Sequence, residues 1–249
     1  MSNIQNNPNR QAVLNFALNN YEEIYCTNPR ISLTNSFSDD LKLIDSCLDL
    51  SNNREGVFIK TILIPYCDLG GFGLELAKLY SNYNFILTCE HQNQYEAIKL
   101  QVTTKNVTVC LEEPGYLTSV DSNSIDAILL FEGYSHCIQK STLIKEIKRV
   151  SKSSSKLLIV DFSSTSTDII EPNYILQNDI GIELENVEIT RSRISQQEFI
   201  LIDQQLNLDN AKKESRSFLS KDRSLQDLDN ALTHLVDTFP FYALLFKKA

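Results

Sequence analysis

The chain has 249 residues, 42% of them hydrophobic, and a net charge of −9. This length suits one large domain with additions, and the negative charge disfavours nucleic acid as a substrate because phosphates would be repelled. No apolar run approaches the roughly 20 residues of a membrane-spanning helix, and the polar start MSNIQNNPNR lacks the features of a signal peptide. We therefore expect a soluble, cytoplasmic protein.

The six cysteines are spread along the chain without a Cys-x-x-Cys pair, and only three histidines are present. This spacing does not fit a zinc site or a disulfide framework. Three of the cysteines, Cys67, Cys89 and Cys110, fall at or near the ends of predicted strands, where a small apolar thiol packs well. We expect free thiols and no metal site.

Two helices are predicted before the first strand. Apolar residues recur every three or four positions over residues 11–25, and a second helix is predicted over residues 38–48. Together they form an N-terminal helical cap, residues 1–56. They either cover a sheet edge or form a lid over a cofactor cleft, in which case Tyr21 and Tyr25 line a substrate pocket.

The segment TILIPYCDLGGFGLELAKL, residues 61–79, organises the rest of the chain. Its apolar start predicts a buried strand at 62–65, a cluster of glycines follows, and the pattern after Gly73 predicts a helix. Strand, glycine turn and helix together present backbone N–H groups to a nucleotide-like ligand. A purely structural turn between strand and helix remains the alternative.

Strands and helices then alternate. Such alternation is typical of βαβ units with a parallel sheet and right-handed crossovers. The further strands are expected at 84–89, 107–111, 125–131 and 156–162, and the helices between them at 94–101 and 141–152.

The end of the chain changes character. We predict a helix near 174–182, a strand over 199–208, and a final strand over 239–248 that pairs antiparallel because no helix follows it. A charged insertion of about 209–237 contains an amphipathic helix. That helix either packs on its own domain or forms a dimer contact or pocket cover, so a homodimer is one expectation.

The order and spacing of these elements resemble the class I S-adenosylmethionine-dependent methyltransferases. The resemblance rests on NVTVCLEEPGYLTSVDSNSIDAILL and LIKEIKRVSKSSSKLLIVDF and spans about residues 57–162, with the last strand as support. The family's usual Pro-Gly-Gly turn is replaced by Ser153–Ser155. The resemblance implies an α/β domain over residues 57–249, with a Rossmann-like, doubly wound sheet of seven strands whose last strand is antiparallel.

The resemblance also implies binding residues for S-adenosylmethionine. Glu90, at the end of the second strand, matches the acid that accepts hydrogen bonds from both ribose hydroxyls, a role that suits the two oxygens of a carboxylate. His91 would flank the adenine. Glu113 matches the acid that meets the adenine amino group, and Glu112 is the alternative if the register differs by one residue.

The glycine-rich loop both matches the family and departs from it. Gly70 matches its last glycine, where the backbone passes close to the ligand. Ile64 stands where the family has an acid, Tyr66 replaces the first glycine, and Asp68 replaces the second. Asp68, or Tyr66 through its hydroxyl, would then meet the cationic methionine end of the cofactor in a weakened or rearranged site.

The segment after the fourth strand matches the family's methyl-donor and substrate region. It begins at Phe131, which would line the cofactor, and continues through Glu132 in the substrate pocket. His136 is the candidate general base for a protonated acceptor, with Tyr134 as a further catalytic candidate. Structural roles remain the alternative for each of them.

Two functions follow from this resemblance. The first is methyl transfer from S-adenosylmethionine to a small-molecule acceptor. The alternative is a catalytically inactive or repurposed member of the fold that serves as a binding or regulatory partner. A nicotinamide-dependent oxidoreductase is disfavoured, because the spacing of Gly70, Gly71 and Gly73 is not Gly-x-Gly-x-x-Gly.

Overall fold

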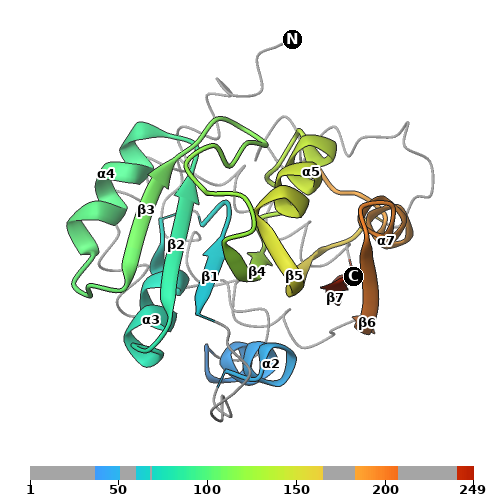
Figure 1. Cartoon of the computed structure of the whole chain (residues 1–249), viewed down its shortest axis with the longest axis horizontal. Coiled ribbons are helices and arrows are strands. Elements are labelled where there is room, and N and C mark those ends of the chain that lie inside the picture. The colour runs from blue at the N-terminus through green and yellow to red at the C-terminus, as the bar shows by residue number, and fades with distance from the viewer. Residues whose placement is uncertain (1–36, 51–59, 68, 165–182, 207–239) are drawn as a thin grey trace, which may run out of the picture.

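A mixed seven-stranded sheet in the order β3-β2-β1-β4-β5-β7-β6 runs through the computed structural model (Figure 1), which describes residues 37–50, 60–67, 69–164, 183–206 and 240–249. The strands are β1 Thr61–Ile64, β2 Asn84–Cys89, β3 Val107–Leu111, β4 Ile125–Phe131, β5 Ser151–Phe162, β6 Phe199–Leu206 and β7 Phe241–Lys248. The helices are α2 Phe37–Leu48, α3 Gly71–Leu79, α4 Gln92–Gln101, α5 Lys140–Val150 and α7 Val187–Ser195.

The sheet is buried on both faces. Side chains of β1 alternate between two cores: Ile62 and Ile64 pack with α2, α3 and α4, whereas Leu63 packs on the other face with α5 and α7. Continuous apolar strands of this kind are expected where helices cover both faces of a parallel sheet. The doubly wound architecture predicted from the sequence is confirmed.

The strands β1 to β5 pair in parallel, and β7 pairs antiparallel with both β5 and β6. The predicted antiparallel final strand is thus confirmed, and the bounds of β2, β3 and β4 coincide with the prediction. The predicted helix over 38–48 is also present as α2, which the Lys156 ammonium joins to β5 by a hydrogen bond to the carbonyl of Cys47.

The start of β5 differs from the prediction. We expected a turn at Ser153–Ser155 and a strand from Lys156, but β5 begins at Ser151. Its register with β4 jumps, because Ile125 pairs with Ser151 and Ala127 with Lys156. The serines form an irregularity within the strand, where Ser154 takes a φ of 65°.

The helix α7 was not predicted. Asn186 caps its start, because the Asn186 side chain accepts a hydrogen bond from the N–H of Glu188, and the helix buries only Thr190 and Ile194. Its apolar stripe is therefore too thin to give a helical pattern. The predicted helices at 11–25, 174–182 and within 209–237 lie outside the described residues, and the division at residue 56 stays a prediction.

None of the helices in the described part of the chain is long and apolar enough to span a membrane. Five cysteines fall within the described ranges, and all five are free thiols.

Candidate functional site

The sheet order reverses between β1 and β4. The chain moves outward from β1 to β2 and β3, then returns to β4 and β5 on the other side of β1. In open α/β sheets, ligands bind at this switch point, outside the carboxyl ends of the strands. Most of the predicted site residues lie at or just after the carboxyl ends of β1, β2, β3 and β4. Because these strands are parallel, their carboxyl ends lie at the same edge of the sheet.

The turn after β1 is held by backbone hydrogen bonds. The N–H of Cys67 donates to the carbonyl of Thr88 over 3.0 Å, and the N–H of Gly70 donates to the carbonyl of Cys67 over 2.8 Å. Gly70 has a φ of 79°, and a Cβ there would lie 3.0 Å from Ile98 Cγ2. Both features favour glycine. Asp68 lies outside the described residues.

The glycine inside α3 is also required by packing. A Cβ on Gly73 would lie 2.4 Å from Leu87 Cδ2, so a larger residue there would push the Leu87 side chain aside between α3 and β2. Ile64, at the position where the family has an acid, is buried in the same core. The turn therefore has structural reasons for its sequence in addition to any contact with a ligand.

Tyr66 takes the place of a glycine with glycine-like backbone geometry. Its φ is 55°, in the left-handed region that few side chains adopt. The hydroxyl accepts a hydrogen bond from the N–H of Gly115 over 2.7 Å and lies 3.0 Å from the sulfur of Cys137. Burial raises the pKa of the phenol, and Cys137 and Glu90 raise it further. The phenol stays protonated.

Glu90 and His91 follow β2 directly. Glu90 is half-buried, and its carboxylate lies close enough to Tyr66 to raise the pKa of the phenol. His91 is the first residue before α4, where its N–H donates to the side-chain oxygen of Gln94 over 3.3 Å and its carbonyl accepts from the N–H of Tyr95. The start of α4 thus fixes the backbone beside Glu90.

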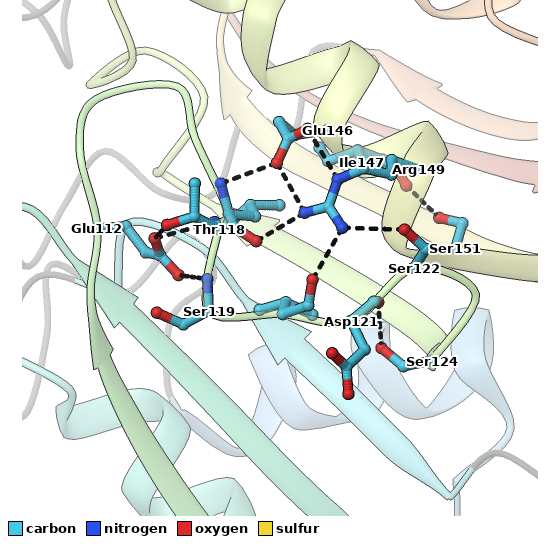
Figure 2. A network of polar contacts seen from close by, with 12 residues as sticks. Glu112, Thr118, Ser119, Asp121, Ser122, Ser124, Glu146, Ile147, Arg149 and Ser151 are labelled. Atoms are coloured by element: carbon cyan, nitrogen blue, oxygen red, sulfur yellow. Dashed lines mark hydrogen bonds and ion pairs between the residues drawn. The ribbon is translucent and has the colours of Figure 1, made fainter.

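The two acids after β3 have different environments. The buried carboxylate of Glu112 accepts hydrogen bonds from the N–H and hydroxyl of Thr118 and from the N–H of Ser119, at 2.8 to 3.0 Å (Figure 2). Glu113 is exposed. Glu112 is therefore committed to the loop itself, and Glu113 is the acid whose side chain faces solvent.

An ion pair on α5 supports the same loop (Figure 2). The Arg149 guanidinium donates to the carbonyls of Leu117 and Val120 over 2.7 and 2.9 Å, and it pairs with Glu146 over 2.7 Å. Glu146 in turn accepts a hydrogen bond from the N–H of Leu117. The Arg149 guanidinium also lowers the pKa of Glu146. These bonds thus hold the loop after β3 against α5.

The segment after β4 begins with a stacked aromatic pair. The rings of Phe131 and Phe72 lie 4.5 Å apart and nearly parallel, which joins the end of β4 to the start of α3. Glu132 then takes a φ of 54°, and its N–H donates to the carbonyl of Val160 over 2.7 Å. A Cβ on Gly133 would lie 3.0 Å from the carbonyl oxygen of Pro65, so this segment passes close to the turn after β1.

Tyr134 lies in the interior. Its hydroxyl donates to the Glu185 carboxylate over 2.8 Å, and Thr190 and Arg193 donate to the same carboxylate. Burial raises the pKa of Tyr134 well above its usual value, and Glu185 adds to this effect. The Tyr134 hydroxyl is thus bonded to a carboxylate in the segment just before α7.

The segment that carries His136 is tied to a fully buried acid. The N–H of Ser135 donates to Asp161 over 2.8 Å, and the buried ammonium of Lys140 donates to the carbonyl of Cys137 over 2.8 Å. Burial raises the pKa of Asp161 to about 6 and lowers that of Lys140. His136 is half-buried between these anchors.

The roles of Asp161, Lys140 and Glu185 in holding this segment were not predicted from the sequence. A signal exists for Asp161, which interrupts the apolar run KLLIVDF of β5. Tyr21 and Tyr25, predicted to line a substrate pocket, lie outside the described residues.

Neither a family model nor a curated protein matches the sequence. Solved structures do match. A protein from Galdieria sulphuraria assigned as a sarcosine dimethylglycine methyltransferase is 15% identical with a TM-score of 0.75, and the match covers 94% of this chain and 98% of that one. Phosphoethanolamine N-methyltransferase 2 from Haemonchus contortus, solved with phosphomonomethylethanolamine and S-adenosylhomocysteine, is 15% identical with a TM-score of 0.73.

That second match covers all of this chain but only 60% of the Haemonchus protein. A third structure, the [4+2]-cyclase SpnF, is 14% identical with a TM-score of 0.62, and the match covers 83% of this chain and 80% of that one. Likeness at such low identity establishes the fold. Together with the strand order and the antiparallel β7, it shows that this chain has the class I S-adenosylmethionine-dependent methyltransferase fold.

Proposed function

We propose that the chain is an S-adenosylmethionine-dependent methyltransferase that acts on a small-molecule acceptor. The observation that carries the proposal is the position of Glu90, a half-buried carboxylate at the end of β2 beside the β1/β4 switch point. A carboxylate there offers two acceptor oxygens to the hydroxyls of a ribose.

The chemistry of the surrounding residues fits this cofactor. Glu113 is an exposed carboxylate able to accept from the adenine amino group, whereas Glu112 is occupied within its loop. Gly70 has no side chain, so the ligand can approach its backbone closely. His91 and Phe131 lie at the same edge of the sheet, where the parallel strands end. Asp68 stays a proposed contact to the methionine end.

When bound, the cofactor supplies an electrophilic methyl group on a sulfonium. The protein's own contribution is to bind and orient both reactants and to exclude water. We assign His136 the removal of a proton from an amine or hydroxyl acceptor, with Glu132 beside it in the substrate pocket. The Tyr134 hydroxyl holds this segment in place by its hydrogen bond to Glu185. Because the hydroxyl is already bonded, we favour this structural role for Tyr134 over a catalytic one.

The acceptor is proposed to be small. The Galdieria and Haemonchus neighbours are named for small amine substrates, sarcosine and phosphoethanolamine. Tyr21 and Tyr25 would complete the pocket from the N-terminal cap, residues 1–56, in a cytoplasmic enzyme. The insertion of about 209–237 is proposed as a pocket cover or homodimer contact.

A second candidate is a repurposed member of the fold. One structural neighbour is named as a cyclase, so the fold serves another reaction. Two departures favour this candidate: Ile64 is buried where the family has an acid, and Tyr66 replaces a glycine. Under this reading the chain is a binding or regulatory protein, or an enzyme of another class.

Isothermal titration with S-adenosylmethionine and S-adenosylhomocysteine separates the two. The methyltransferase proposal predicts micromolar binding that Glu90→Ala weakens by about tenfold or more, which equals about 1.4 kcal/mol. Glu96→Ala, which removes an exposed carboxylate from α4, is the matched control and should bind like the wild type. Absence of binding at millimolar ligand would favour the repurposed protein.

A further inference from the structure

The loop after β3 contains a tight turn over residues 113–116. The N–H of Tyr116 donates to the carbonyl of Glu113 over 2.9 Å, and Gly115 between them has a φ of 81°. The ring of Pro114 fixes its own φ at about −65°, so the turn is of type II, with proline and glycine at its two central positions. Glu113, the candidate acid for the adenine amino group, is the first residue of this turn.

The central amide of the turn is bonded to a residue from another strand end. A type II turn is closed by a hydrogen bond between its first and fourth residues, which does not involve the N–H of the third residue. Gly115 is buried, and a buried N–H that lacks an acceptor is costly. The hydroxyl of Tyr66 supplies the acceptor at 2.7 Å. The turn is therefore joined to the segment that follows β1.

Tyr66 makes this bond from an unfavourable backbone conformation. Its φ of 55° suits glycine, and a larger residue persists there only when its surroundings hold it. A Cβ on Gly133 would lie 3.1 Å from the Cβ of Tyr66, so the missing side chain at Gly133 makes room for the tyrosine. The hydroxyl also lies 3.0 Å from the sulfur of Cys137. The segment after β4 thus holds the phenol where it reaches the turn.

The backbone around Glu113 is fixed on its other sides as well. The N–H of Glu112 donates to the carbonyl of Cys89 over 2.9 Å, which holds the chain beside β2 as it leaves β3. A Cβ on Gly115 would lie 2.8 Å from Gln139 Cβ, so the turn packs closely against the residue before α5. The side chain of Glu113 itself is exposed. An exposed carboxylate on a fixed backbone can bind a ligand without further ordering of the chain.

We propose that Tyr66 is a positioning residue that holds the turn of residues 113–116 and thereby places Glu113 for the adenine amino group. The inference rests on the proposed function, since it assigns Glu113 to the adenine. Tyr66 on this view gives the loop after β1 a side-chain anchor that the glycine of the family lacks. Restoring the glycine would relieve the backbone of Tyr66 and weaken the recognition of adenine.

The test measures how well the protein distinguishes S-adenosylhomocysteine from an analogue with purine in place of adenine, which lacks the amino group. Wild-type protein should prefer S-adenosylhomocysteine by about tenfold, the usual worth of a hydrogen bond to a charged group. Glu113→Ala should abolish the preference. Tyr66→Phe, which keeps the ring and removes the hydroxyl, should lower the preference by about threefold or more and weaken the purine analogue much less.

Three further variants keep the test independent of stability. Tyr66→Gly removes both the hydroxyl and the backbone strain, so it should lose the preference like Tyr66→Phe even where Tyr66→Phe folds poorly. Tyr66→Phe in a Glu113→Ala background should have no additional effect on the preference, because the group that it positions is absent. Tyr80→Phe, which removes a phenol hydroxyl at the end of α3, is the control and should keep the wild-type preference.

Amide exchange tests the same bond without any ligand. The N–H of Gly115 should exchange faster in Tyr66→Phe than in the wild type, because its acceptor is gone. The N–H of Leu117 donates to Glu146 and should exchange at the wild-type rate. Exchange at Gly115 that Tyr66→Phe leaves unchanged would overturn the inference.

The binding outcomes separate this inference from the proposed function. Wild-type protein that binds neither ligand would overturn the proposed function and this inference with it. Wild-type protein that binds S-adenosylhomocysteine would overturn the inference alone if it shows no preference over the purine analogue, or if Tyr66→Phe keeps the preference or weakens both ligands equally. Loss of the preference in Tyr66→Phe and Tyr66→Gly but not in Tyr80→Phe would support it.

Discussion

The ionisation of Asp161 should be measurable in the stability of the protein. Asp161 is fully buried, and burial raises its pKa from 3.8 to about 6, although hydrogen bonds from the N–H groups of Ser135 and Phe162 oppose the rise. The native state therefore binds this proton more tightly than the unfolded chain. The stability from this group is fully present below the unfolded pKa of 3.8 and is lost as the pH rises through about 6.

The size of the effect follows from the two pKa values. Each pH unit between them is worth about 1.4 kcal/mol, so the difference between 3.8 and about 6 corresponds to about 3 kcal/mol. Asp161→Asn removes the titration. It also leaves one backbone N–H without a good acceptor, which costs about 1 to 3 kcal/mol at every pH. That second cost does not change with pH, so it cancels when two pH values are compared.

Urea unfolding at about pH 4 and about pH 7 measures this difference. The free energy of unfolding of the wild type, relative to Asp161→Asn, should fall by about 2 kcal/mol between the two pH values. This is less than the full difference, because the unfolded carboxyl is already partly ionised at about pH 4. The neighbours Lys140 and Tyr242 are present in both proteins, so their contributions largely cancel. Asp121→Asn, which removes an exposed carboxylate, is the control. Parallel pH dependence in wild type and Asp161→Asn would refute the reasoning.

Two further variants test the supports of the site. Gly73→Ala should lower the free energy of unfolding by about 1 kcal/mol, because the Cβ would lie 2.4 Å from Leu87 Cδ2 in the core and this overpacking outweighs the better helix propensity of alanine. An unchanged or raised urea midpoint would contradict the close packing of α3 on β2. Arg149→Ala should cost about 1 kcal/mol, a value lowered by its partial exposure, and it should speed amide exchange at residues 117–120. Exchange at the wild-type rate would show that the ion pair does not hold the loop, and Arg191→Ala is the control for an exposed pair.

The sequence predicted those elements whose pattern is local. Strands β2, β3 and β4 are apolar runs bounded by turn residues, and their predicted bounds coincide with the structure. Helix α7 was not predicted, because its two buried residues, Thr190 and Ile194, are too few to give a periodic apolar pattern. The start of β5 was misread because consecutive serines are typical of a turn, whereas pairing with β4 holds Ser151 in the sheet.

The candidate site was predictable in its positions and not in its contacts. Glu90 and the acid pair after β3 could be placed from strand ends, because parallel strands finish at one edge of the sheet. Which acid of the pair is free for a ligand required the hydrogen bonds of Glu112. The bond from Tyr66 to Gly115 spans 49 residues and the bond from Ser135 to Asp161 spans 26. No local pattern encodes such tertiary contacts.

The structure of the protein with bound S-adenosylhomocysteine would test the central claim most directly. Both ribose hydroxyls should lie within hydrogen-bonding distance of the Glu90 carboxylate, with the adenine amino group beside Glu113. A ligand bound away from the β1/β4 switch point, or a ribose that makes no contact with Glu90, would contradict it.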